Sequence, residues 1–154
     1  MIDTPRIVET ETQQTAVIRL TIPREQMRQA MGPGIRELLG VVAAQGITPT
    51  APWFTHHFKM DPKIFDFEIG VPVPAAIAAV GRVQAGHLPA AKVARAIYHG
   101  PYEGLSGAWG ELTQWIKAEG LAEAAELWES YVKGPESSPD SADWQTELNR
   151  PLID

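Results

Sequence analysis

The chain has 154 residues and a formal net charge of −6 at pH 7, and its content of 44% hydrophobic and 21% charged residues is typical of a soluble globular protein. The lack of cysteine excludes disulfides and thiolate metal sites, and the lack of a Lys/Arg cluster argues against nucleic-acid binding by this chain alone. Because there is neither an apolar run of 18 residues nor a signal-peptide pattern, we expect one cytoplasmic domain over residues 1–154, monomeric or homodimeric and without membrane contact.

The first half of the chain reads as strand, helix and hairpin. Residues 6–22 are rich in Val, Ile and Thr, which predicts one long strand or a bent pair. The "GPG" at 32–34 interrupts a helical pattern, so we expect a short helical turn and then a helix from Ile35 to Ala44. "APWFTHHFKM" and "KIFDFEIGVPV" flank a "DP" turn signal and predict an antiparallel hairpin, and a short strand is expected near residues 80–85.

The second half repeats this order. "KVARAIYHG" predicts a strand, and "GPYEGLSGAWGELTQWIKAEG" predicts a helix with an apolar stripe of Leu105, Trp109, Leu112 and Ile116, ended by Gly120. "ELWESYVKG" and "ADWQTELNRPL" predict a second hairpin across a Pro/Ser-rich loop.

An internal repeat relates the two halves. "FDFEIGVPVP" aligns with "WQTELNRPLI" at an offset of 79 positions (147 − 68), which places Glu68 on Glu147 and Pro72 on Pro151. We therefore predict an α+β fold of two pseudo-twofold β-α-β-β units, over about residues 5–73 and 92–152, with antiparallel sheet and two main helices. Each proline is expected to mark the end of strand pairing or an edge position.

At these motifs the chain resembles the GyrI-like small-molecule-binding domain, which also forms the effector-binding half of AraC-type and MerR-type multidrug-responsive regulators. The resemblance rests on "HGPYEGL", the Trp-bearing helix and the terminal "WQTELNRPL" strand. It implies a pocket between the halves for bulky, often cationic aromatic ligands, with a glutamate that meets the positive charge. Glu147 of "TEL" matches that glutamate, and Tyr131 and Trp109 match pocket-lining aromatic residues. No helix-turn-helix fits before Arg6, so a direct role as a transcription factor is not expected.

Each candidate residue also has a structural interpretation. Glu147 is either a solvated acid on a sheet face or the ligand carboxylate, and Glu68 is either a structural acid or a second acidic wall. Aromatic residues are either core or pocket lining, and the lining candidates are Trp53, Trp109, Tyr102 and Tyr131. The four histidines lack metal-ligand spacing, so neither a metal nor a cofactor is predicted.

The resemblance leaves three functions open. The first is binding of hydrophobic, cationic aromatic small molecules, as in drug or toxin sensing. The second is hydrolysis of strained-ring or electrophilic toxic compounds on the same scaffold, with Glu147 as base and Tyr131 as proton donor. The third is a protein-interaction module such as a gyrase modulator.

Overall fold

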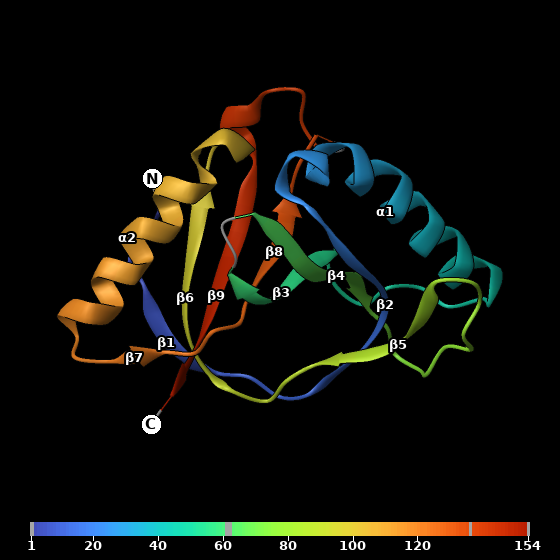
Figure 1. Cartoon of the computed structure of the whole chain (residues 1–154), viewed down its shortest axis with the longest axis horizontal. Helices are drawn as coiled ribbons and strands as arrows, with labels where there is room; N and C mark the ends of the chain where they lie inside the picture. Colours follow the sequence, from blue (N-terminus) through green and yellow to red (C-terminus); the bar gives the residue numbers. More distant parts are fainter. Residues whose placement is uncertain (1, 61–62, 136, 154) are drawn as a thin grey trace. The chain divides into compact units, whose positions relative to one another are not determined.

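The chain folds into two compact units, described in turn (Figure 1). This computed structural model describes residues 2–60, 63–135 and 137–153. Unit 2 comprises Glu11–Ala90, and unit 1 comprises the remaining described residues on either side of it in the sequence. Within the described part of the chain, no helix has the length and apolar character needed to cross a membrane.

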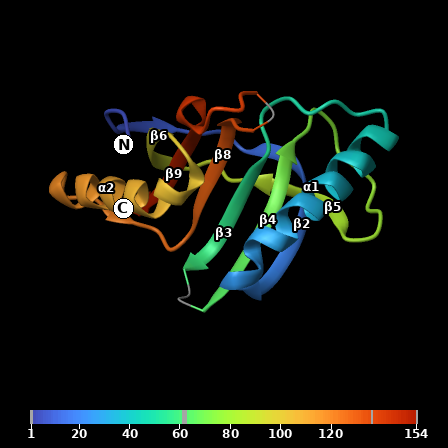
Figure 2. The same cartoon turned by 90° about the horizontal axis from the view of Figure 1, so that it is seen from above.

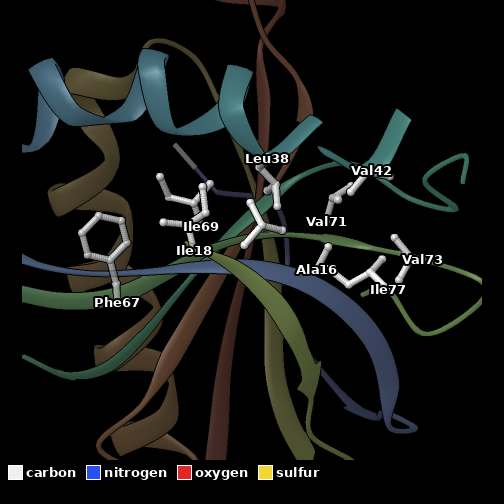
Figure 3. Close-up of a cluster of buried hydrophobic side chains, with 10 residues drawn as sticks. Ala16, Ile18, Leu38, Val42, Phe67, Ile69, Val71, Val73 and Ile77 are labelled. Carbon is white, nitrogen blue, oxygen red and sulfur yellow. The ribbon is translucent and has the colours of Figure 1, made fainter. Parts of the chain in front are cut away.

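Unit 2 is an antiparallel sheet with strand order β3-β4-β2-β5 and helix α1 on one face (Figure 2). The elements are β2 (Gln13–Pro23), the short 3-10 helix η1 (Arg24–Gln26), α1 (Met27–Ala44), β3 (Phe54–Met60), β4 (Ile64–Pro72) and β5 (Val83–Leu88). Alternate residues of β2 and β4 face α1, and Ile18, Ile69 and Leu38 meet between sheet and helix (Figure 3). The core of this unit is therefore aliphatic, with Phe67 at one end.

Unit 1 contains antiparallel strands in the order β1-β6-β9-β8, against which helix α2 packs. The elements are β1 (Arg6–Glu9), β6 (Lys92–His99), η2 (Tyr102–Gly104), α2 (Leu105–Ala118), β7 (Ala122–Glu123), β8 (Leu127–Lys133), η3 (Ser141–Asp143) and β9 (Gln145–Ile153). Buried Leu112 and Ile116 of α2 pack on Ala96 and Leu148 of the sheet. Ala94, Ala108 and Tyr98 belong to the same core.

The two helices, the antiparallel sheet and both hairpins of the sequence analysis are confirmed. In each unit the strand before the main helix and the hairpin after it form one ladder, β2-β4-β3 in unit 2 and β6-β9-β8 in unit 1. The single-domain description and the repeat boundaries stay predictions. The "DP" turn at Asp61–Pro62 lies outside the described residues.

Helix α1 runs without interruption through "GPG", so the expectation of a helix starting at Ile35 was wrong. Met27, Met31, Ile35, Leu38 and Val42 form a continuous stripe at helical spacing, and all five pack against the core of unit 2. Tertiary burial of this stripe outweighs the hydrogen bond that Pro33 removes. Gly34 permits the close approach, since a Cβ there would lie 2.7 Å from Ile69 Cδ1.

Residues 6–22 form two strands, which is one of the two expected alternatives; β1 pairs with β6 in unit 1, and β2 pairs with β4 and β5 in unit 2. Two other boundaries differ from expectation. The strand expected near residues 80–85 is β5, shifted to Val83–Leu88 by the turn at Gly81, whose φ is +58°. Pro151 does not end β9, which continues beyond the proline and pairs with β7.

Candidate ligand-binding site

A glutamate of unit 1, Glu129, lies among aromatic side chains. On β8 it pairs with Leu148 of β9, and directly opposite residues share a face, so its side chain is on the side of the sheet that α2 covers. Trp109 of α2 donates from Nε1 to Glu129 Oε2 at 2.6 Å. Tyr131, two residues along β8, donates from its hydroxyl to Oε1 at 2.6 Å. Both carboxylate oxygens are thus held by neutral donors.

The aromatic surroundings continue beyond these two donors. The ring of Tyr102 meets that of Tyr131 edge-on at a centroid distance of 5.9 Å, and lies 5.0 Å from the ring of Trp144. We call Trp109, Tyr131, Tyr102 and Trp144 the aromatic wall. Three of them are half-buried and Tyr131 is buried, so the wall presents part of its surface to solvent. Flat, amphipathic rings of this kind are common in ligand pockets.

The "HGPYEGL" motif positions one part of the wall. The hydroxyl of buried Tyr98 donates to the carbonyl of Pro101 at 2.8 Å, which fixes the chain as it enters η2. Gly104 follows directly above this hydroxyl, since a Cβ at Gly104 would lie 2.0 Å from it. The tight entry places Tyr102 in η2 beside Tyr131 and starts α2 at Leu105.

The electrostatics of Glu129 are unusual for a glutamate. Burial raises the pKa of its carboxyl above the usual value, and the hydrogen bonds from Tyr131 and Trp109 oppose this only in part. Among the described residues, no basic side chain forms an ion pair with it. A half-buried carboxylate without a cation costs free energy, which a positively charged ligand can offset.

Glu147, the acid singled out from sequence, lies elsewhere in the same unit. It alternates with Leu148 on β9 and therefore faces away from α2. Its Oε1 is 3.4 Å from Arg95 Nε and accepts from Asn149 Nδ2 at 3.2 Å, so it already has a cationic partner. Its role as the ligand carboxylate stays a prediction.

The remaining candidates divide between the units. Trp109, Tyr102 and Tyr131 come together near Glu129 in unit 1. Glu68 belongs to unit 2, where it lies opposite Arg19 and His56 in the ladder; burial raises the pKa of its carboxyl, and these neighbours counteract the rise. Trp53 packs partly buried on the core of unit 2. The ligand-binding roles of Glu68 and Trp53 stay predictions.

The sequence analysis missed Glu129 and Trp144 as site residues. A signal for Glu129 was present in "LWESY", because Leu127, Glu129 and Tyr131 alternate along one face of a strand. Because Leu127 and Tyr131, two positions before and after the acid, are hydrophobic or aromatic, the pattern indicates that Glu129 points inward with them. Among the described residues, no group of three or more His, Cys, Asp or Glu side chains is placed to hold a metal ion.

Comparison with known proteins agrees with this fold. Residues 3–152 match the GyrI-like small molecule binding domain. The C-terminal domain of EcmrR is 25% identical with a TM-score of 0.86, covering 97% of each chain. EcmrR in its DNA complex is 27% identical with a TM-score of 0.84, and this chain covers 57% of that longer chain. No curated protein sequence matches.

Two further structures share the fold at lower identity. SAV2435, solved with bound tetraphenylphosphonium, is 16% identical with a TM-score of 0.69, covering 98% of this chain and 94% of its own. A hydrolase from Listeria innocua is 12% identical with a TM-score of 0.71, covering 97% of this chain and 91% of its own.

Proposed function

We propose, since this chain belongs to the GyrI-like family of small-molecule-binding domains, that unit 1 binds hydrophobic aromatic cations at Glu129. The observation that carries the proposal is the half-buried Glu129 carboxylate, which among the described residues is hydrogen-bonded by neutral donors alone and is bordered by the aromatic wall. The tetraphenylphosphonium bound by SAV2435 is a ligand of this class in a protein of the same fold.

Two attractions act together on such a ligand. The carboxylate contributes charge, and it does so strongly because burial leaves it poorly solvated. Each aromatic face adds roughly 0.5–2 kcal/mol of cation–π attraction, depending on how far the contact is desolvated. Neither attraction requires a particular ligand outline, so selectivity arises from positive charge and flat apolar area. This is the behaviour expected of a sensor for diverse drugs or toxins.

The test compares two glutamates of neighbouring strands. Glu129→Gln keeps the side-chain size and removes the charge, and it should weaken tetraphenylphosphonium binding by about 1.5–3 kcal/mol, the range for hydrogen bonds to charged groups. Glu147→Gln is the matched control, because Glu147 faces away from α2 and is paired with Arg95. Isothermal titration of both variants with tetraphenylphosphonium and neutral triphenylphosphine oxide measures the effects.

Binding of the neutral compound should be little changed by Glu129→Gln. If Glu147→Gln instead produces the selective loss, the ligand carboxylate is the residue that the family motif indicates. Equal losses for both compounds, or no loss in either variant, would contradict a charge-based role for both residues. Thermal denaturation of each variant verifies that the fold is retained.

A second candidate function is hydrolysis of an electrophilic ligand. It is favoured by the 2.6 Å hydrogen bond between the Tyr131 hydroxyl and Glu129, a carboxyl with raised pKa. A glutamate of that kind can accept a proton from water, and a phenol can donate one to a leaving group. Mass analysis of candidate ligands after incubation separates the functions, because hydrolysis adds the mass of one water and binding leaves the ligand unchanged.

A further inference from the structure

A polar cavity of about 490 Å³ lies in unit 1, where the β8–β9 loop closes over the end of the sheet. Its lining includes His99, Lys133 and Gln145 from the strands, and Ser137, Ser138 and Asp143 from the loop. The size is within the usual range for small-molecule sites. We propose that this cavity binds the anionic group, phosphate or carboxylate, of a small metabolite.

The three strand residues form one row across the sheet. Gln145 of β9 pairs with His99 of β6 on one side and with Lys133 of β8 on the other. Directly paired residues share a face, so the three side chains point the same way. Gln145 alternates with Thr146 and Leu148, which face α2, and the row is therefore on the opposite side of the sheet from Glu129. The anion site is separate from the cation site.

A β-bulge brings Lys133 into this row. The register of β8 against β9 shifts between Tyr131 and Lys133, so Val132 is passed over and Lys133 lies opposite Gln145. Without the shift, Val132 would occupy that position. Bulges commonly re-aim a side chain beside a functional site. Here the bulge exchanges an aliphatic side chain for an ammonium group at the cavity.

Unit 2 has the same bulge, but there the paired strand carries a carboxylate. The register of β3 against β4 shifts between His57 and Lys59, and the residue opposite Lys59 is Asp66. The Asp66 carboxylate accepts from Arg19 Nε at 2.8 Å and from the Thr21 hydroxyl at 3.2 Å. At the corresponding place unit 1 has Gln145, which is neutral. The row in unit 1 thus keeps its cation without a carboxylate directly opposite it, and the Asp143 carboxylate of the cavity lining accepts from the Ser138 hydroxyl at 2.9 Å.

In the described part of this site, the row supplies donors that remain available to a ligand. In the loop, the N–H groups of residues 137–138, 140 and 142–144 donate within the loop itself. The Ser137 hydroxyl donates to Gly134 O, and the Ser138 hydroxyl donates to Asp143 Oδ2. Among the described residues, the Lys133 and His99 side chains form neither an ion pair nor a hydrogen bond. Lys133 offers three donors and the His99 imidazole at least one, which suits an oxyanion.

The test titrates the full chain with inorganic phosphate and, separately, with acetate, each at constant ionic strength set by chloride. Wild type should show saturable binding of at least one of the two anions by isothermal titration. Lys133→Met should weaken that binding at least tenfold. Gln145→Asp should also weaken it at least tenfold, because it restores the carboxylate that unit 2 carries. Lys117→Met, an exposed lysine in the last turn of α2, is the matched control and should leave binding unchanged.

Binding of phosphate alone, acetate alone or both supports the proposal and identifies the anionic group. Absence of saturable binding to either anion in wild type overturns it, as does binding that both Lys133→Met and Gln145→Asp leave unchanged. Tetraphenylphosphonium titration of the same variants is the independent readout. It should be unaffected by either change, so failure of the anion site and failure of the cation site are distinguishable.

Discussion

The helix–sheet interfaces of the two units have corresponding strand pairing but different side chains at the paired positions. In unit 2, His57 of β3 pairs with Phe67 of β4, and their rings stack at 5.1 Å with Phe65 edge-on to both. At the corresponding position of unit 1, Tyr131 of β8 pairs with Thr146 of β9. A small side chain thus replaces the phenyl ring, and Tyr131 directs its hydroxyl to Glu129 rather than stacking.

The neighbouring pair of residues in the ladder also differs between the two units. Thr55 pairs with Ile69 in unit 2, and Glu129 pairs with Leu148 in unit 1. Unit 2 therefore uses this region for packing, whereas unit 1 keeps a carboxyl group and partly exposed rings there. This difference supports the proposal that the ligand site lies in unit 1.

The largest expected difference is in the response to truncation of an aromatic side chain. Phe67 is fully buried, so Phe67→Ala should lower the free energy of unfolding by about 3–5 kcal/mol. Trp109 is half-buried, so Trp109→Ala should cost markedly less and should instead weaken tetraphenylphosphonium binding. Chemical denaturation and isothermal titration measure both effects. Equal destabilisation by the two changes would remove the distinction between the units, and a Trp109→Ala variant with unchanged stability and binding would refute a role for the ring.

Lowering the pH should change the stability contributions of His57 in unit 2 and Glu129 in unit 1 in opposite directions. Burial lowers the pKa of His57 from 6.5 to about 4, so the unfolded chain binds more protons between these pH values. The stability due to neutral His57 is present above pH 6.5 and is lost as pH falls to 4, by up to about 3 kcal/mol at 1.36 kcal/mol per pKa unit. The free energy of unfolding, measured by denaturation at several pH values in this range, should fall less steeply with acid in His57→Phe than in wild type. The same pH dependence in both proteins would show that His57 is not responsible.

The contribution of Glu129 to stability depends on pH in the opposite sense. Its folded pKa is raised, so its contribution is most favourable below the unfolded value of 4.5 and is lost as pH rises through the folded pKa. Above pH 4.5, wild type should therefore lose stability relative to Glu129→Gln. The same denaturation series measures this, and a difference between the two proteins that does not vary with pH would show that Glu129 has an ordinary pKa.

The smallest expected effect is at Thr146, which occupies in unit 1 the position that Phe67 has in unit 2. Thr146 is fully buried, and its hydroxyl has no hydrogen-bond partner among the described residues. Thr146→Val has a similar shape without the polar atom and should stabilise the protein by about 1 kcal/mol. Thr146→Ser, which retains the hydroxyl, should not. A destabilising Thr146→Val, measured by thermal denaturation, would indicate that the hydroxyl contributes to the structure after all.

Local patterns were sufficient for the parts of the fold that depend on short-range geometry. Alternating apolar residues predicted both hairpins, and the stripe from Leu105 to Ile116 predicted α2. Gly46 and Gly120, each with φ +72°, end the two helices as expected of glycine in the left-handed region. The same reasoning failed at "GPG", because the energy that keeps α1 continuous comes from contacts of Met31 and Ile35 with the sheet.

The sequence by itself determined the α+β class, the family and the aromatic residues Trp109, Tyr102 and Tyr131 as site candidates. Only the tertiary structure decided which acid they surround. Alternation along a strand divides Glu129 from Ser130 and Glu147 from Leu148, but it does not say which face a helix covers. That face is set by the packing of Leu112 and Ile116 on Leu148. Because desolvation depends on this coverage, the shifted pKa of Glu129 could be assigned only once α2 was in place.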